Sequence, residues 1–190
     1  MATSTISICN MALGWLGGNL ITSLDDESNE AALCKANYEP CRDAVLEDRD
    51  WTFATSRQIL SPLTASPAFG YAYKYQVPSD LIRILKVSDE PAFVHDFEWE
   101  RQEDVMLTDA AILYLKYIKR ITDPTKFSAG FVHALAARIA MEIALPLTNS
   151  PEMHQSMVAM YGTKLERAGA MDGTQGKNEV FRTNRLIGVR

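Results

Sequence analysis

Apolar residues at the start of the chain recur with the period of an α-helix. Ile8, Ala12 and Trp15 follow one another at intervals of three or four residues, which places them on one helix face. Serine and threonine at positions 3–5 are suited to cap the first turn, and the glycine pair at 17–18 stops the pattern. We therefore expect a helix over about residues 3–16.

A second helical stripe follows a short acidic segment. Acidic residues at 25–27 suit the positive end of a helix. Pro40 lies inside the pattern and is expected to kink it near residues 36–39, because proline removes one backbone donor. The pattern predicts a helix over about residues 27–48, with one apolar face made of Ala31, Cys34, Tyr38, Cys41 and Val45.

The middle third of the chain has a different period. Prolines at 62, 67, 78 and 91 interrupt any long helix, and tyrosines at 71, 73 and 75 alternate with other residues as in a strand. Short strand-like runs occupy residues 57–60, 71–77, 81–87, 93–99 and 111–118. We expect a small, mostly antiparallel sheet within residues 55–120.

The third predicted helix is apolar around almost its whole circumference. It follows a cap and a proline at 123–124 and covers about residues 125–147. Ser128, Arg138 and Glu142 share one narrow polar stripe, and His133 projects from the opposite side. Such a helix must be buried between neighbours, and we expect His133 to be a hydrogen-bonded core residue rather than a metal ligand.

Arg138 and Glu142 are the one polar pair that this helix singles out. They are four residues apart, a spacing at which opposite charges can form an ion pair on a helix surface. The pair is expected either to be buried in the bundle or to lie at a contact between subunits.

A fourth helix follows directly. Residues 150–152 supply a cap, a proline and an acid, and a methionine-containing stripe runs on until Gly169, a natural stop. We expect this helix over about residues 151–168. The predicted fold class is thus α+β and mainly α: a bundle of about four helices, a small antiparallel sheet and an extended C-terminal arm.

The last residues differ from the rest of the chain. A linker-like start at 173–176 leads into a segment with four basic side chains and one acidic side chain, a net charge of +3. Because the whole chain carries −5, residues 1–172 carry −8. We expect residues 1–172 to be one folded unit and residues 173–190 a flexible basic arm, which is either a solvated chain end or a segment that orders on an acidic partner.

Composition narrows the classes of function. The 190 residues are 47% hydrophobic and 23% charged, as in an ordinary globular protein. The acidic balance argues against a general DNA-binding surface, because such affinity comes from basic residues that neutralise phosphates; it is compatible with DNA passing by. We find no apolar window long enough to span a membrane and no basic start of a signal peptide, since the first basic residue is Lys35. We expect a protein that folds in a cytoplasm.

Candidate chemistry is sparse. Cys9, Cys34 and Cys41 contain no CxxC pair, and Cys34 and Cys41 are too far apart along one helix for a disulfide, so we expect buried free thiols. None of His95, His133 and His154 has a metal-ligand spacing. Phosphate-loop, dinucleotide-loop and nucleophile-elbow motifs do not occur. We expect no catalytic residue, no metal and no cofactor.

Two aromatic residues after the second helix allow two interpretations. Trp51 and Phe53 could be a stacking platform for nucleic acid, or a core anchor between bundle and sheet. Because the surrounding sequence is not a basic patch, the core anchor is favoured.

Several short motifs follow one another in a recognisable order along the chain. They include Cys9-Asn10-Met11-Ala12-Leu13, Leu16-Gly17, Asp25-Asp26, Trp51-Thr52-Phe53-Ala54, Tyr75-Gln76-Val77-Pro78 and Ala134-Leu135-Ala136-Ala137-Arg138. Through these motifs the chain resembles, over about residues 6–170, the head-to-tail adaptor proteins of short-tailed bacteriophages, the group of tail tubular protein A and the tail accessory factors. A His-Pro familiar before the tryptophan in that family is replaced here by Arg49-Asp50.

The resemblance implies a non-enzymatic structural protein of the virion tail, present in the host cytoplasm before assembly. Such adaptors form a twelve-fold ring below the portal protein, bind the portal through their C-terminal segments and meet the next, nozzle-type tail protein beneath. DNA passes through the ring without specific binding, and no membrane is involved. Position and composition make Phe181, Arg182, Arg185, Leu186, Ile187 and Arg190 the portal-binding candidates.

Two other functions stay open at this point. A small cell-wall hydrolase of the tail would need two facing carboxylates about 5–10 Å apart, one of them with a raised pKa. A DNA-binding regulator is disfavoured by the acidic charge.

Overall fold

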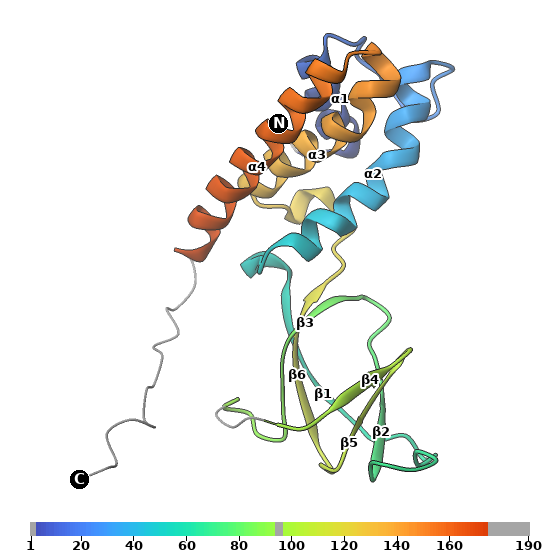
Figure 1. Ribbon diagram of the computed structural model, residues 1–190, viewed down its shortest axis with the longest axis vertical. Helices are drawn as coiled ribbons and strands as arrows, with labels where there is room; N and C mark the ends of the chain where they lie inside the picture. The colour runs from blue at the N-terminus through green and yellow to red at the C-terminus, as the bar shows by residue number, and fades with distance from the viewer. Residues whose placement is uncertain (1–2, 94–96, 175–190) are drawn as a thin grey trace, which may run out of the picture.

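The computed structural model describes residues 3–93 and 97–174, which form two lobes (Figure 1). The helical lobe consists of residues 3–54 and 121–174, and the sheet lobe of residues 55–93 and 97–120. The lobes lie at opposite ends of an elongated molecule, joined where the chain leaves and re-enters the helices. The predicted unit 1–172 contains two hydrophobic clusters: one fills the helical lobe and includes Ile118 at the near end of the sheet lobe, and the other lies within the sheet lobe.

Four α-helices build the helical lobe: α1 (Thr5–Leu16), α2 (Asn29–Asp48), α3 (Ala129–Thr148) and α4 (Pro151–Gly173). Each begins after a serine whose side-chain oxygen accepts a hydrogen bond from a backbone N–H three residues later, at 3.1–3.3 Å. These serines satisfy backbone donors that a helix start leaves unpaired. The N-caps are Ser4, Ser28, Ser128 and Ser150.

The helix boundaries differ from the predicted ones for local reasons. The first two helices begin two residues later than expected, directly after their serine caps. Residues expected to open the third helix form a separate 3-10 turn, η2 (Pro124–Lys126), capped by Asp123. The expected stop at Gly169 is wrong, because α4 continues to Gly173; Gly169 instead gives room to the Arg49 side chain, which would lie 3.4 Å from a Cβ added there. Helix α2 remains one helix through Pro40.

Helix α3 is the centre of the helical lobe. It packs against the other three helices (Figure 1). Its length and apolar composition would suffice to cross a membrane, contrary to our expectation that no such window exists. However, 56% of that window is buried inside the protein, as in a core helix. Its buried residues are Phe131, Val132, Ala134, Leu135, Ala136, Ala137, Ile139, Ala140, Ile143 and Ala144.

Aromatic rings pack together at the end of this core that adjoins the sheet lobe. Trp51 and Phe53 flank Phe131 with ring centroids 5.1 and 5.2 Å away, in edge-to-face geometry. Trp51 is fully buried, and its indole N–H donates to the Val45 carbonyl at 2.7 Å. The prediction that Trp51 is a core anchor is confirmed.

The sheet lobe contains two antiparallel three-stranded sheets rather than the single sheet expected. One has the order β1 (Thr55–Leu60), β6 (Leu113–Lys119), β3 (Leu81–Ser88); the other has β2 (Tyr73–Gln76), β5 (Val105–Thr108), β4 (Glu100–Gln102). Residues 93 and 97–99 of the expected strand 93–99 are not in a strand, and 94–96 lie outside the described residues. Strands β4 and β5 were not predicted, because three or four residues are too few for an alternating pattern. The fold class, α+β and mainly α, is confirmed.

One prediction concerns the crossing of α3 and α4. A Cβ added at Gly130 would lie 2.9 Å from the Ala168 Cβ and 3.2 Å from its Cα. Gly130→Ala should therefore reduce the free energy of unfolding by about 1–3 kcal/mol, because two helix backbones must separate.

The matched control is Gly162→Ala on α4, where nothing lies within 4 Å of an added Cβ. That substitution should stabilise by about 0.5–1 kcal/mol through helix propensity alone. Urea unfolding measures both variants, and a neutral or stabilising Gly130→Ala would contradict the close crossing.

Candidate functional site

The predicted portal-binding residues Phe181, Arg182, Arg185, Leu186, Ile187 and Arg190 lie outside the described residues. The structure describes the chain up to Thr174, the residue from which the C-terminal segment continues. The described chain ends at Thr174, one residue after α4, so Gly173 belongs to a helix and not to the linker expected from residue 173.

Asp172 fixes this point to the junction between the lobes. Its carboxylate accepts two hydrogen bonds from Thr52, one from the backbone N–H at 2.7 Å and one from the hydroxyl at 2.9 Å. Asp172 is 5% exposed, and Thr52 opens the 3-10 helix η1 (Thr52–Ala54) that leads into strand β1. The last turn of α4 is thus anchored to the segment that joins bundle and sheet.

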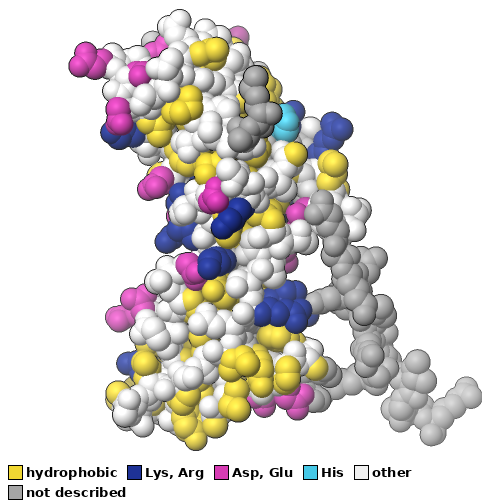
Figure 2. Space-filling model, turned by 180° about the vertical axis from the view of Figure 1, so that it is seen from behind, with side chains coloured by type: hydrophobic (Ala, Val, Ile, Leu, Met, Phe, Trp, Pro, Cys, Tyr) yellow, Lys and Arg dark blue, Asp and Glu magenta, His cyan; other side chains and the backbone are white. Residues whose placement is uncertain are grey.

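Ion pairs hold the two lobes together at the same level. Arg83 on β3 pairs with Asp50, which follows α2. Arg120, after β6, binds Asp43 on α2 at 2.9 Å, and buried Arg42 binds the same carboxylate at 2.8 Å. Figure 2 shows Lys and Arg side chains interspersed with Asp and Glu around the middle of this face.

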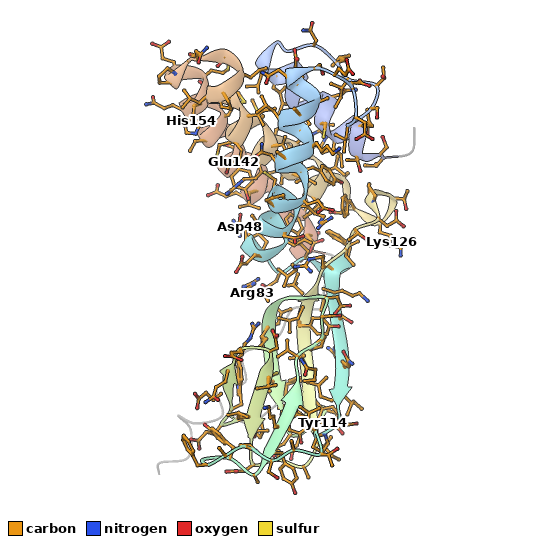
Figure 3. All side chains as sticks on the ribbon, turned by 90° about the vertical axis from the view of Figure 1, so that its right-hand side faces the viewer. Asp48, Arg83, Tyr114, Lys126, Glu142 and His154 are labelled. Atoms are coloured by element: carbon orange, nitrogen blue, oxygen red, sulfur yellow. The ribbon has the colours of Figure 1, made fainter. Side chains whose placement is uncertain are left out.

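A cavity of about 380 Å³ lies at this junction. Arg83 and Asp48 line this cavity, and Figure 3 shows that they come from the sheet lobe and the helical lobe on either side of the junction. The base of the C-terminal segment therefore lies beside a polar hollow, lined by Asp48, Arg49, Asp50, Trp51, Arg83, Gly169, Asp172 and Gly173.

Arg138 and Glu142 form the predicted ion pair, with 3.1 Å between Nη2 and Oε1. The pair is partly exposed rather than buried, with 28% and 39% of the two side chains accessible. The Arg138 guanidinium also lies 5.4 Å from the centre of the Tyr161 ring, and the Tyr161 hydroxyl donates to Asp48. One cluster therefore links α3, α4 and α2, and its role within the chain is to join three helices.

Burial, and then the hydrogen bond to the Asp48 carboxylate, raise the pKa of Tyr161. The phenol is 8% exposed, so its ionised form would lose hydration and lie against a negative charge. Burial likewise raises the pKa of the neighbouring Cys41 thiol to about 12. Both groups remain protonated at neutral pH, which suits a structural role.

The histidines and cysteines considered as candidate ligands differ in their burial. His133 is exposed, not a core residue as expected, because three packed neighbours leave one strip of α3 uncovered. His154 is half-buried on α4, and His95 lies outside the described residues. All three cysteines are buried and free, as expected. Within residues 3–93 and 97–174 no group of three or more His, Cys, Asp or Glu side chains could hold a metal ion.

A larger cavity, of about 680 Å³, lies between strands of the sheet lobe. Its walls carry Arg101 and one carboxylate, Asp104. Paired-carboxylate hydrolysis needs a second acid across the cavity, so this cavity lends no support to that chemistry. The described carboxyl groups with a shifted pKa, Asp26, Glu30, Asp80 and Asp123, all shift downward through hydrogen bonds, opposite to a general acid.

Sequence reasoning missed the Asp172–Thr52 contact. The two residues are 120 positions apart, and Asp172 stands next to a glycine at the start of an apparent linker. A buried acid at the end of a helix leaves no periodic signal.

No protein-family model matches the chain, and no curated protein matches it.

The anchor at Asp172 can be tested by substitution. Asp172→Ala removes both hydrogen bonds to Thr52, one of them to a backbone N–H, so it should reduce the free energy of unfolding by about 1–2 kcal/mol. Glu166→Ala, an exposed acid on the same helix, should change it by less than about 0.5 kcal/mol. Equal effects of the two variants in urea unfolding would show that the anchor contributes nothing.

The Tyr161 hydroxyl predicts a pH dependence. Its folded-state pKa is raised, so its stabilising effect is complete below about pH 10, the ordinary tyrosine value, and is lost as pH rises through the folded pKa. Tyr161→Phe should reduce the free energy of unfolding by about 1–2 kcal/mol at pH 8. Above pH 10, the free energy of unfolding of this variant should decline less steeply than that of the natural chain.

Tyr114→Phe in the sheet lobe is the control, since Tyr114 is partly exposed on β6. This substitution should reduce the free energy of unfolding by less than about 0.5 kcal/mol. Unfolding free energies between pH 8 and 11 provide the measurement. Parallel pH curves for the natural chain and Tyr161→Phe would contradict the assignment.

Proposed function

We propose that this chain is a head-to-tail adaptor of a short-tailed bacteriophage. It forms a ring, with twelve subunits as the resemblance implies, between the portal protein above and the next, nozzle-type tail protein below. DNA passes through the ring without specific binding. The protein belongs to the virion tail and is present in the host cytoplasm before assembly, and its role is structural.

The anchored end of α4 is the observation that carries this proposal. A C-terminal segment that must reach a partner needs a rigid base, and Asp172 ties that base to the lobe junction through Thr52. The following residues are basic and contain aromatic and aliphatic anchors such as Phe181 and Leu186. Sixteen residues can extend to roughly 50 Å, which is enough to reach over a neighbouring protein.

The distribution of charge supports different roles for the folded part and the C-terminal segment. The net charge of +3 in residues 173–190 opposes the −8 of the remaining chain. An acidic wall does not retain a passing duplex, because affinity for DNA comes from basic residues at phosphates. A basic segment with apolar anchors suits an acidic protein groove, where it orders on binding.

Ring formation requires an interface that joins two different surfaces of neighbouring subunits and closes after a fixed number of copies. The elongated two-lobed subunit presents different lateral surfaces of helix and sheet (Figure 1). A closed ring needs the two lobes in one orientation, and ion pairs between Arg83 and Asp50 and between Arg120 and Asp43 link the lobes.

The proposal is tested by deleting residues 175–190 so that the chain ends at Thr174, the last residue of the described fold. Affinity for purified portal rings from the same genome should fall at least about tenfold, because the ordering segment is lost. Circular dichroism and the thermal midpoint of the truncated protein should match those of the full chain.

Single charge reversals give the matched comparison. Arg185→Glu should weaken portal binding and reduce its salt dependence, whereas Lys126→Glu, an exposed basic residue of the helical lobe, should not. Unchanged portal affinity of the truncated protein would overturn the proposal that this segment docks on the portal.

A further inference from the structure

Strand β1 has an open edge. It is the outermost strand of its sheet, whose order is β1-β6-β3, so within residues 3–93 and 97–174 no strand pairs with its other side. Arg57 and Ile59 are two residues apart on β1 and therefore share one face of it. Both side chains are exposed, Ile59 to 62%. An open edge with an exposed apolar side chain can accept a further strand.

A cavity of about 160 Å³ lies beside these two side chains. Its lining contains Arg57 and Ile59 together with Pro91, Phe93 and Tyr114. Phe93 has φ 53°, a left-handed backbone conformation that a bulky residue rarely adopts. Such outliers cluster where a ligand is held. The cavity is suited to receive an apolar side chain that stands next to an acidic one.

The C-terminal segment starts close to the beginning of this edge. Asp172 accepts a hydrogen bond from the backbone N–H of Thr52, three residues before β1 begins. Seven residues separate Thr52 from Ile59, and seven separate Thr174 from Phe181. Seven extended residues span about 23 Å, so Phe181 can reach the level of Ile59 along β1.

The side chains of this segment are complementary to the edge. Glu179 is the only acidic side chain after residue 173, and Phe181 is the only aromatic one. In an extended chain these two side chains point to the same side, with the same spacing as Arg57 and Ile59. Among the described residues we find no ion pair of Arg57, so its guanidinium is available to a carboxylate.

We infer that residues 179–181 of the free subunit bind to the open edge of β1 in the same chain as a short added strand. Both segments start at the lobe junction, so the two strands run in the same direction. Glu179 pairs with Arg57, and Phe181 covers Ile59 and enters the cavity. Backbone groups on the open side of β1 gain hydrogen-bond partners.

The role of this contact rests on the proposed function. Phe181 is one of the portal-binding candidates, and one side chain cannot bind β1 and the portal at the same time. The contact therefore keeps this side chain covered in the free subunit, and the portal must displace β1 to bind it. The contact itself requires only the isolated chain.

Chymotrypsin measures the contact, because it cleaves after aromatic residues. Full-length protein is digested briefly, and the release of residues 182–190 is followed by mass spectrometry. The rate is divided by that of a synthetic peptide with the sequence of residues 175–190, which has no β1 to bind. Cleavage follows the population of the unbound form. The natural chain should therefore be cut after Phe181 at least about tenfold more slowly than the peptide.

A charge exchange tests the pairing. Arg57→Glu and Glu179→Arg should each accelerate cleavage about three- to tenfold, because attraction becomes repulsion, and the double variant should return to the natural rate. Ile59→Asn should also accelerate cleavage, because the apolar contact with Phe181 is lost. Lys126→Glu, an exposed residue of the helical lobe, is the matched control and should leave the rate unchanged.

Cleavage of the natural chain as fast as the peptide would overturn the inference, and so would a double variant that is cut as fast as the single variants. Protection that increases with protein concentration would place the segment on a second copy, contrary to a contact within one chain. Protection together with unchanged portal affinity after truncation would refute the proposed function and leave this contact standing. Lost portal affinity after truncation without protection would refute this contact alone.

Discussion

The structure depends on the need to cover α3 on nearly all sides. This helix has ten buried residues, and water would meet an apolar surface wherever a neighbour was missing. Burying each large side chain is worth about 1.5–3 kcal/mol, so α1, α2 and α4 are held around it by the same surface. Gly130 allows α4 to approach α3 closely, and the rings of Trp51 and Phe131 close the core where the sheet lobe begins.

The junction between the lobes follows from this packing. Because α2 and α4 both run along α3, their C-terminal ends reach the level at which the chain enters and leaves the sheet lobe (Figure 1). Asp50 and Asp43 pair there with arginines of the sheet lobe, and Asp172 binds Thr52. Apolar contacts of Ile82, Leu85 and Ile118 with the helical core join the lobes at the same level, and α4 ends at this junction.

Local signals predicted the helices well and the sheets less well. The apolar periodicity of each helix extends over many residues, so it predicts the helix from the sequence alone. The spacing of four residues between Arg138 and Glu142 likewise predicts their ion pair. Strands β4 and β5 contain only three and four residues, which is too few to show an alternating pattern. The sequence therefore predicted one sheet where the structure has two. The contacts of Asp172 with Thr52 and of Tyr161 with Asp48 span 120 and 113 positions, and no local pattern encodes them.

In the proposed function, this subunit joins others in a ring and binds the portal through its basic C-terminal segment. Electron microscopy of the full-length chain mixed with portal rings tests that account most directly. It predicts a closed ring of subunits below the portal, with residues 175–190 seated on portal protein and the two lobes in the orientation described above. Portal rings that remain bare at saturating concentrations of the full-length chain would contradict it.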